Sequence, residues 1–194
     1  MIKLSKDVKF LVGKKLFMRP IMPQDLPYFV KWINDKETLE MLSAYLPVTI
    51  KEEAEWIESL SNKNHTDIQL AIVTTDGNLI GSMGIHKIDW KNRTASTGAF
   101  IGDKNYWGKG YGTEAKMLLL NYAFNTLNLR KIYSSAIEYN KRSIAYQMKC
   151  GYKIEGRRIK QHFRKGRYWD EILTAVFKKD WLPIWKEYKK QYLE

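Results

Sequence analysis

Three glycines alternate with larger residues between Asn105 and Ala115, in the stretch NYWGKGYGTEA. Gly108, Gly110 and Gly112 leave the backbone uncovered, so its N–H groups can approach a ligand closely. The following run has the composition of a helix, and a helix begins with unpaired N–H groups and the positive end of its dipole. The stretch therefore predicts an anion site, most often one for phosphate.

Two common phosphate motifs do not match this loop. A P-loop requires Gly-Lys followed by Ser or Thr, but Gly110 follows Lys109, and the spacing from Gly102 is one residue too long. A dinucleotide fingerprint requires G-x-G-x-x-G inside a parallel βαβ unit. Here the spacing is G-x-G-x-G, after segments that predict an antiparallel meander. The phosphate compound must therefore be identified from the rest of the chain.

The composition fits one globular domain. The chain has 194 residues, of which 44% are hydrophobic, and no linker or repeat divides it. This length allows one sizeable α/β core, so we expect one domain over 1–194 with a helical tail over 181–194. The net charge of +12 favours acidic partners such as phosphorylated cofactors, nucleic acid or the ribosome, although charge alone does not select among them.

The sequence also bears on location. No apolar run approaches 18 residues, and the first ten residues have no apolar core of a secretory signal. Cys150 is the only cysteine, so no internal disulfide can form, as is typical of a reducing cytoplasm. We therefore expect a cytoplasmic protein that does not act in a membrane.

The predicted elements follow the order β-α-α-β-β-β-α-β-α-β-β. Asp-Gly at 76–77 between two apolar runs predicts a hairpin, Thr49 with Glu52 predicts a capping box, and Gly151 predicts a helix end. The fold class is α/β (α+β), a mixed sheet with an antiparallel meander, a glycine loop and a central helix. Strands are predicted over 15–21, 67–75, 78–89, 93–102, 130–138, 152–160 and 167–177, and helices over 23–35, 49–62, 113–127 and 140–150.

The glycine loop and several later segments together resemble the GNAT superfamily of acetyl-CoA-dependent N-acetyltransferases. The matching segments are YWGKGYGTEA, LNLRKIYSS and NKRSIAYQMKCGYKIEG, preceded by LFMRPIMPQDL and WIND. The chain is most similar to the branch with ribosomal-protein N-terminal acetyltransferases and spermidine acetyltransferases. The resemblance covers roughly 15–178 and implies a GNAT fold and acetyl transfer from acetyl-CoA to a primary amine.

The resemblance implies how coenzyme A is bound. The loop backbone and the start of the next helix would hold the pyrophosphate, with Lys109 adding charge. Phe100, Ile101 and Gly102 would pair with the pantetheine arm through their backbone, and one N–H there would polarise the thioester carbonyl. Asn140 would contact the pantetheine amide, with plain helix capping as the alternative. The loop residues assigned to the cofactor are Trp107, Gly108, Lys109, Gly110, Tyr111, Gly112 and Thr113.

The reaction also needs a proton donor for the departing thiolate. Many superfamily members place a tyrosine seven residues after the asparagine of this helix, where the present chain has Gln147. Tyr146 lies one residue earlier, about 100° round the helix, and is a catalytic candidate whose alternative role is a core tyrosine. Ser143 matches the serine of ribosomal-protein members; it would lie near the cofactor and donate the proton.

The base that accepts the amine proton is less well defined by the sequence. Relatives often carry a glutamate just before an IGY-like stretch of the fourth strand, where this chain reads ASTGAFIG and has Ser96 and Thr97. His86, Asp89 and Glu138 are candidates by their positions on strands or strand ends. A chain of water molecules is the alternative.

The acceptor side is predicted from one hairpin. Tyr168 and Asp170 match a motif that lies near the acceptor in this branch, and His86 is a further candidate contact. The basic and aromatic segment 157–169 could instead contact RNA. A protein α-amine, a polyamine, an aminoglycoside and an amino-sugar all remain open, although the charge of +12 argues mildly against polyamines.

The sequence also bears on metal sites, subunit contacts and nucleic acid. His65, His86 and His162 are far apart in the sequence, so no metal set is predicted. The aromatic tail predicts a helix that covers the protein's own core or a subunit contact and is compatible with a homodimer; a membrane-surface helix is the minor alternative. Nucleic acid is expected only through a ribosomal substrate. The alternative function is a catalytically silent GNAT-fold module that binds acyl-CoA and RNA or the ribosome.

Overall fold

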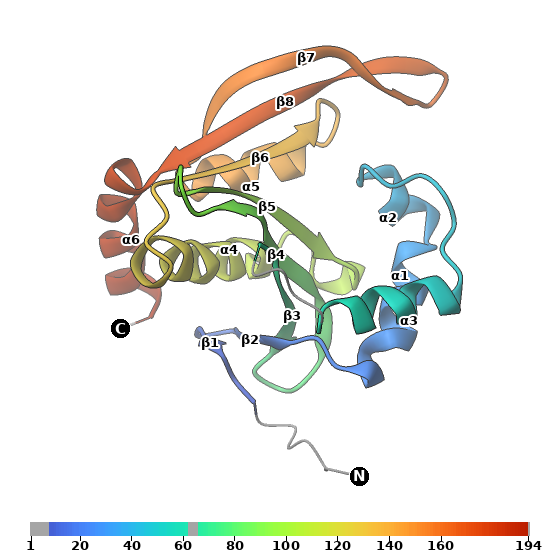
Figure 1. Cartoon of the computed structure of the whole chain (residues 1–194), viewed down its shortest axis with the longest axis horizontal. Coiled ribbons are helices and arrows are strands. Elements are labelled where there is room, and N and C mark those ends of the chain that lie inside the picture. Colours follow the sequence, from blue (N-terminus) through green and yellow to red (C-terminus); the bar gives the residue numbers. More distant parts are fainter. Residues whose placement is uncertain (1–7, 62–65, 194) are drawn as a thin grey trace.

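A twisted mixed sheet runs through the molecule (Figure 1). The computed structural model describes residues 8–61 and 66–193, and within them eight strands are ordered β1-β2-β3-β4-β5-β6-β8-β7. All neighbouring strands are antiparallel except β5 and β6, which are parallel. The strands are β1 (Leu11–Val12), β2 (Leu16–Pro20), β3 (Ile68–Thr74), β4 (Leu79–Asp89), β5 (Thr94–Ile101), β6 (Lys131–Ile137), β7 (Lys153–Arg164) and β8 (Arg167–Phe177).

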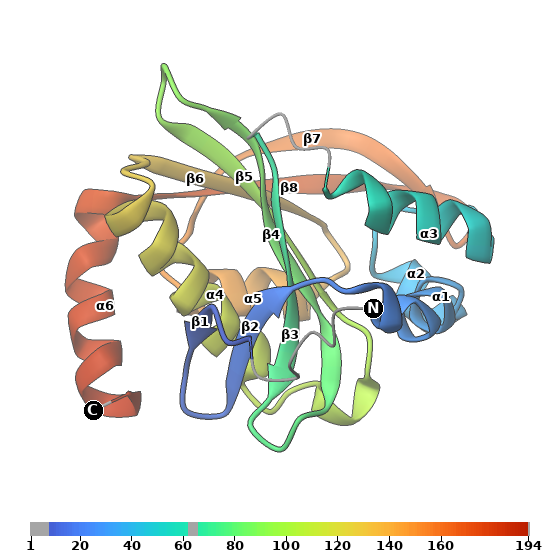
Figure 2. The ribbon, with the colours of Figure 1, turned by 60° about the horizontal axis from the view of Figure 1, so that its bottom comes forward.

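Helices cover the two faces of the sheet unequally (Figure 2). One core cluster lies between the sheet and the side that carries α4, α5 and α6, and a smaller cluster lies under α1 and α3. The central helix α4 is buried continuously over residues 114–120, including the charged Glu114 and Lys116. The helices are α1 (Leu26–Ile33), α2 (Lys36–Glu40), α3 (Ile50–Ser59), α4 (Tyr111–Asn121), α5 (Lys141–Lys149) and α6 (Lys178–Tyr192).

The structure confirms the predicted fold class, element order and local signals. Thr49 and Glu52 form a reciprocal capping box at the start of α3. Gly77 in the β3–β4 turn and Gly151 after α5 have φ of 91° and 90°, which favours glycine at both positions. Two short elements, β1 and α2, were not predicted, since neither is long enough to show a hydrophobic period. Position 62, the last residue of the predicted helix over 49–62, lies outside the described residues, and so does position 65, one of the three histidines considered as metal ligands.

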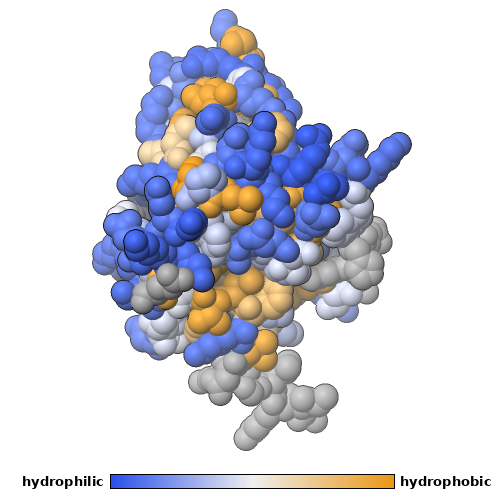
Figure 3. Space-filling view, turned by 90° about the vertical axis from the view of Figure 1, so that its left-hand side faces the viewer, coloured by the Kyte–Doolittle hydropathy of each residue, from blue (hydrophilic) through white to orange (hydrophobic). Residues whose placement is uncertain are grey.

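The tail forms the helix α6, which packs on the core. Trp181 is fully buried against Phe124, with ring centroids 5.3 Å apart. Trp185, Tyr188 and Tyr192 continue the ring stack along the helix. Hydrophilic side chains cover most of the face that carries α6, with apolar patches between them (Figure 3). The aromatic spacing therefore reflects core packing. Among the described residues, no helix has the length and apolar character needed to cross a membrane.

Candidate functional site

The sheet opens between its two parallel strands. β5 and β6 pair with each other only over Thr94–Ser96 and Lys131–Tyr133; beyond these residues β5 pairs only with β4 and β6 only with β8. Where they part, Ser134 Oγ donates to the Thr97 carbonyl, with an O···O distance of 3.0 Å. The gap, which we call the opening, exposes backbone edges of two strands near the glycine loop that follows β5.

Strand geometry decides which backbone groups face the opening. Alternate residues of a strand direct their N–H and C=O groups to opposite edges. The Thr97 carbonyl faces β6, where it accepts from Ser134, so Ala99 and Ile101 also direct their groups toward the opening. The Gly102 N–H donates to the Ile80 carbonyl of β4 over 2.9 Å.

The sequence predicts that the backbone of Phe100, Ile101 and Gly102 pairs with the pantetheine arm, and the direction of their backbone groups corrects this prediction. Phe100 pairs with Ser82 in the β4–β5 ladder, so it and Gly102 face β4. Of the three predicted residues, Ile101 directs its backbone toward the opening, and Ala99, which was not predicted, does so as well. The sequence could not reveal Ala99, because the direction of the backbone depends on the register of β5 against β4.

The glycine loop forms a bare turn into α4. Gly108 and Gly110 have φ of 73° and 87°, and a Cβ on Gly108 would meet no atom within 4 Å. Gly110 is the N-cap of α4, and the first helical bond joins Glu114 N–H to its carbonyl over 3.0 Å. The N–H groups of Tyr111 and Gly112 precede this bond and point out of the helix end. This cradle fits a phosphate group.

Cationic side chains surround the loop. Lys15 Nζ donates to the Lys109 carbonyl over 3.2 Å, and Lys109 itself is exposed. The Arg142 guanidinium lies 3.7 Å from the Trp107 ring centroid. Lys15 and Arg142 were not predicted as site residues, since they come from the β1–β2 turn and from α5. Their charges strengthen the case for an anion at the loop.

Trp107 and Glu114 hold the loop in place. Trp107 Nε1 donates to the Ile101 carbonyl over 2.7 Å, which ties the loop to the end of β5. The buried Glu114 carboxylate accepts from the Lys15 N–H over 2.8 Å. Glu114 thus joins α4 to the β1–β2 turn, in addition to its favourable place near the positive helix end.

Ser143 lies in the first turn of α5. Asn140 caps this helix by accepting from the Ser143 N–H over 3.1 Å, and its amide donates to the Met41 carbonyl. Gln147 Nε2 donates to Ser143 Oγ over 3.2 Å, and the buried Gln147 carbonyl accepts from Thr174 on β8. Because Ser143 Oγ accepts from Gln147, its own proton remains available to another acceptor.

Tyr146 faces α4 and packs against the main core cluster. Burial raises the pKa of its hydroxyl well above the usual range. Beside it lies the fully buried Lys116, whose Nζ donates to Thr97 Oγ1 over 2.7 Å. Burial lowers the pKa of Lys116 to about 8 and raises that of Cys150 to about 12. These surroundings match the core-tyrosine alternative for Tyr146.

The opposite face of the sheet is partly uncovered between α1–α3 and the β7–β8 hairpin. Thr97, Ile132 and Thr174 point toward α4 and α5. Their neighbours along each strand point the other way, and Gly98 and Ser135 there are exposed. We call this surface the open face; its members are His86 of β4, Ser96 and Gly98 of β5, Tyr133 and Ser135 of β6, and Trp169 and Glu171 of β8.

Glu171 is the buried carboxylate of the open face. It accepts from Ser135 Oγ over 2.6 Å and from Arg158 Nη1 over 2.8 Å. Burial acts to raise its pKa, but these hydrogen bonds outweigh burial, so the pKa is lowered. Glu171 is therefore a charged group at neutral pH.

The predicted acceptor residues of β8 lie on the other side. Trp169 packs against Tyr139 on the open face, with ring centroids 4.9 Å apart. Since side chains alternate along a strand, Tyr168 and Asp170 point away from that face. Tyr168 and Asp170 therefore lie off the open face, whereas Trp169 and Glu171 lie on it.

The Glu138 side chain, like those of Tyr168 and Asp170, points away from the open face. Arg157 Nη1 lies 2.9 Å from Asp170 Oδ2 and 3.6 Å from Glu138 Oε1. Arg157 is paired in register with Ile172, which points to the same side of β8 as Thr174, the residue that bonds Gln147 of α5. Glu138 therefore lies beside Arg157 at the hairpin, away from the open face, and its role as a catalytic base stays a prediction.

The remaining candidate bases differ in their surroundings. Asp89 accepts from the N–H and the amide of Asn92, both over 2.7 Å, and so caps the β4–β5 turn. His86 lies on the open face, with Nδ1 3.1 Å from Asp67 Oδ1. Asp67 was not predicted as a site residue, because only the pairing of β3 with β4 brings it to His86.

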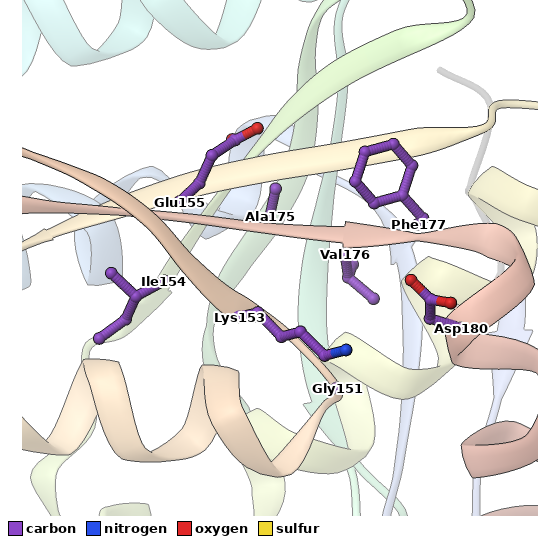
Figure 4. Close-up of a pocket in the computed structure, with 8 residues that line it drawn as sticks. All are labelled: Gly151, Lys153, Ile154, Glu155, Ala175, Val176, Phe177 and Asp180. Carbon is purple, nitrogen blue, oxygen red and sulfur yellow. The ribbon is translucent and has the colours of Figure 1, made fainter.

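The described residues contain no cluster of three or more His, Cys, Asp or Glu side chains that could hold a metal ion. Two cavities lie apart from the opening, and Asp67 is among the residues that line the second. One, of about 190 Å³, lies between β7, β8 and the first turn of α6 (Figure 4), and the other, of about 400 Å³, lies near β3. The first is lined by Gly151, Lys153, Ile154, Glu155, Ala175, Val176, Phe177 and Asp180, none of which is a predicted site residue.

Comparisons with known proteins identify the family. A family model described as an acetyltransferase (GNAT) domain matches residues 15–153. The SPbeta prophage-derived uncharacterized N-acetyltransferase YokL of Bacillus subtilis (strain 168) is 27% identical over 173 residues, 89% of this chain and 96% of YokL. The spermidine N(1)-acetyltransferase of Escherichia coli (strain K12) is 31% identical over 111 residues, 57% of this chain and 59% of that protein.

A solved structure has the same fold. The spermidine N-acetyltransferase from Vibrio cholerae, in complex with CoA and spermine, superposes with a TM-score of 0.80 at 23% identity, over 87% of this chain and 98% of that one. The family match spans the opening, the glycine loop and α5. The chain therefore belongs to the acetyltransferase (GNAT) family and is an acetyl-CoA-dependent N-acetyltransferase.

Proposed function

We propose that the protein transfers the acetyl group to a primary amine of a small molecule by direct attack in a ternary complex. The observation that carries this proposal is the opening between β5 and β6. It has the phosphate cradle at one end and the open face on the side away from α4 and α5. The acetyl arm and the amine can thus approach the same gap from two sides.

The cradle and the opening supply the contacts that acetyl-CoA needs. The N–H groups at the start of α4 would bind the pyrophosphate, together with Lys15 and Lys109. The backbone groups of Ala99 and the N–H of Ile101 would pair with the amides of the pantetheine arm, since the Ile101 carbonyl already accepts from Trp107. The N–H of Ala99 is then the candidate for polarising the thioester carbonyl.

Ser143 is the proposed proton donor for the thiolate. Its hydroxyl oxygen already accepts from Gln147, and Thr174 in turn holds the Gln147 amide. This arrangement fixes the side chain that stands at the usual tyrosine position and leaves the serine proton to be donated. Tyr146, which faces α4, has no part in this proposal.

The acceptor class is proposed from relatives and from the open face. Spermidine is the substrate in the names of two similar proteins, which supports a small-molecule amine. On the open face, Trp169 and Glu171 supply an aromatic ring and a carboxylate, groups that suit an alkylammonium ion. A protein N-terminus is the competing acceptor.

A thiol-release assay tests this function. Acetyl-CoA is mixed with spermidine, an aminoglycoside, an amino-sugar or short peptides, and free CoA is measured. We expect release with a small amine and none with peptides. Release with peptides alone would instead identify a protein acetyltransferase. Calorimetric binding of acetyl-CoA without release by any amine would support the catalytically silent module.

The same assay tests Ser143. For Ser143→Ala we expect kcat to fall by roughly 100-fold, the usual contribution of a positioned acid, with unchanged acetyl-CoA affinity. Ser59→Ala, which removes a hydroxyl from the exposed end of α3, is the matched control and should keep the wild-type rate. A kcat of Ser143→Ala equal to the control would remove the serine from the mechanism.

A further inference from the structure

His86 and Asp67 form a pair on the open face. His86 Nδ1 lies 3.1 Å from Asp67 Oδ1, and Asp67 also accepts from the Lys87 N–H and from Thr66 Oγ1. A carboxylate oxygen only accepts hydrogen bonds, so Nδ1 carries the proton that joins the pair. The other ring nitrogen, Nε2, then has a free lone pair.

Asp67 is held as the charged form. Burial acts to raise its pKa, but the hydrogen bonds from Thr66, His86 and Lys87 outweigh burial and lower it. The carboxylate is therefore ionised at neutral pH, fixes the tautomer of His86 and stabilises the imidazolium that forms when Nε2 takes up a proton.

Two glycines make room for the imidazole. Gly84 and Gly98 face each other across β4 and β5. A Cβ on Gly84 would come within 2.8 Å of His86 Nε2, and one on Gly98 within 3.4 Å. The imidazole thus lies over bare backbone of β5. Gly98 is followed directly by Ala99, whose backbone faces the opening.

We propose that His86 is the catalytic base of this N-acetyltransferase and that Asp67 is its positioning residue. The inference rests on the proposed function, because it assumes that the amine reaches the opening from the open face. Relatives often carry a glutamate where this chain has Ser96 and Thr97 on β5. In this proposal His86, on the neighbouring strand β4, takes the place of that glutamate.

Nε2 removes one proton from the ammonium group of the acceptor, and the neutral amine attacks the carbonyl carbon to form the C–N bond. The C–S bond breaks, and the thiolate takes the proton that Ser143 donates. The nitrogen loses its second proton to restore Ser143, and the imidazolium releases its proton to solvent. One acetylamine, one CoA thiol and one proton result.

The charged groups around His86 are few. Asp67 comes from the segment before β3, and Lys87 follows His86 on β4. Across the open face, Glu171 with Arg158 and His162 comes from the β7–β8 hairpin. Asp67 is the one described carboxylate within ion-pair distance of His86, so its removal should be the main change in the imidazole's surroundings.

The decisive measurement is the pH profile of kcat/KM with calorimetry of acetyl-CoA binding. For His86→Gln we expect kcat to fall by roughly 100-fold, loss of the acidic limb of the profile, and unchanged acetyl-CoA affinity. For Asp67→Asn we expect a fall of about tenfold, because the imidazole loses the carboxylate that orients it. Asp89→Asn, a turn carboxylate, is the matched control.

A second variant distinguishes the loss of a base from a folding defect. Added imidazole should restore part of the activity of His86→Gly, since the small base can occupy the vacated space. A wild-type rate and an unchanged acidic limb in His86→Gln would overturn the proposal while leaving the acetyltransferase intact. Absence of CoA release from the wild-type protein with every amine would instead overturn the proposed function, and this inference with it.

Discussion

The glycine-loop side of the opening and its open face are built from different groups. The loop side offers backbone N–H groups, held by two glycines of positive φ and by the start of α4. The open face offers side chains that alternate along β4, β5, β6 and β8. A backbone site depends on what φ each position allows, whereas a side-chain site depends on strand register. Different mutations should therefore impair acetyl-CoA binding on the loop side and amine binding on the open face.

The largest expected effect is on the loop side. Gly110→Val places a β-branched residue at φ 87°, where a non-glycine residue costs about 1–3 kcal/mol. It also adds bulk where the phosphate would lie. We expect acetyl-CoA affinity measured by calorimetry to fall by at least about 100-fold, since the strain and the obstruction add.

Gly166→Val is the matched control for that change. Gly166 has φ of 75° in the β7–β8 turn, and a Cβ there meets no atom within 4 Å. The control carries similar strain but lies far along the chain from the loop, so it should lower the melting temperature and keep acetyl-CoA affinity. Equal losses of affinity in both variants would show that strain alone, and not the cradle, is responsible.

The two sides also differ in how they hold a buried charge. Glu171 has an arginine partner on the open face, whereas Lys116, below the loop side, has no carboxylate within ion-pair distance among the described residues. Lys116→Met should therefore stabilise the protein at pH 7 by about 2 kcal/mol, which is less than the full cost implied by the pKa shift because the hydrogen bond to Thr97 is lost.

The sign of the pH dependence follows from the same pKa. Folding lowers the pKa of Lys116 from 10.5 to about 8, so the unfolded chain binds more protons between these values. The destabilisation by Lys116 is complete below pH 8 and disappears as the pH rises to 10.5. Urea unfolding should thus show the advantage of Lys116→Met shrinking over this window. An advantage independent of pH would refute the charge as its cause.

The smallest effect concerns the register of the open face. For Glu171→Gln we expect KM for the amine to rise about tenfold, since one charge-assisted contact contributes about 1.5 kcal/mol. Asp170→Asn, one residue earlier on β8, should leave KM unchanged, because its side chain binds Arg157 on the other side. Steady-state kinetics with the amine identified in the thiol-release assay distinguish them. The opposite ranking would restore the register predicted from the sequence.

These contrasts explain what the sequence could predict. The loop, the cap at Asn140 and the stop at Gly151 each depend on local backbone geometry, and local geometry selects particular residue types. The order of strands and helices followed for the same reason, since each long element has its own hydrophobic period. The loop side was therefore largely predictable, apart from the cations Lys15 and Arg142, which tertiary packing brings in.

The open face was not predictable in the same way. A one-residue change of register turns every side chain of a strand to the other face, and this is the difference between Asp170 and Glu171. Asp67 reaches His86 only through the pairing of β3 with β4. Ala99 likewise requires knowledge of which edge of β5 faces the opening. No residue type marks these positions, because each depends on a partner strand.

The short ladder between β5 and β6 also affects how the protein resists unfolding. Three residue pairs join strands β1–β5 to strands β6–β8, so the sheet has a seam with few backbone hydrogen bonds. Acetyl-CoA bound along this seam would act as an inserted strand that both halves share. Its free energy of binding would then add to the free energy of unfolding. The cellular supply of the acetyl donor would thereby also set how well the protein withstands heat and proteolysis.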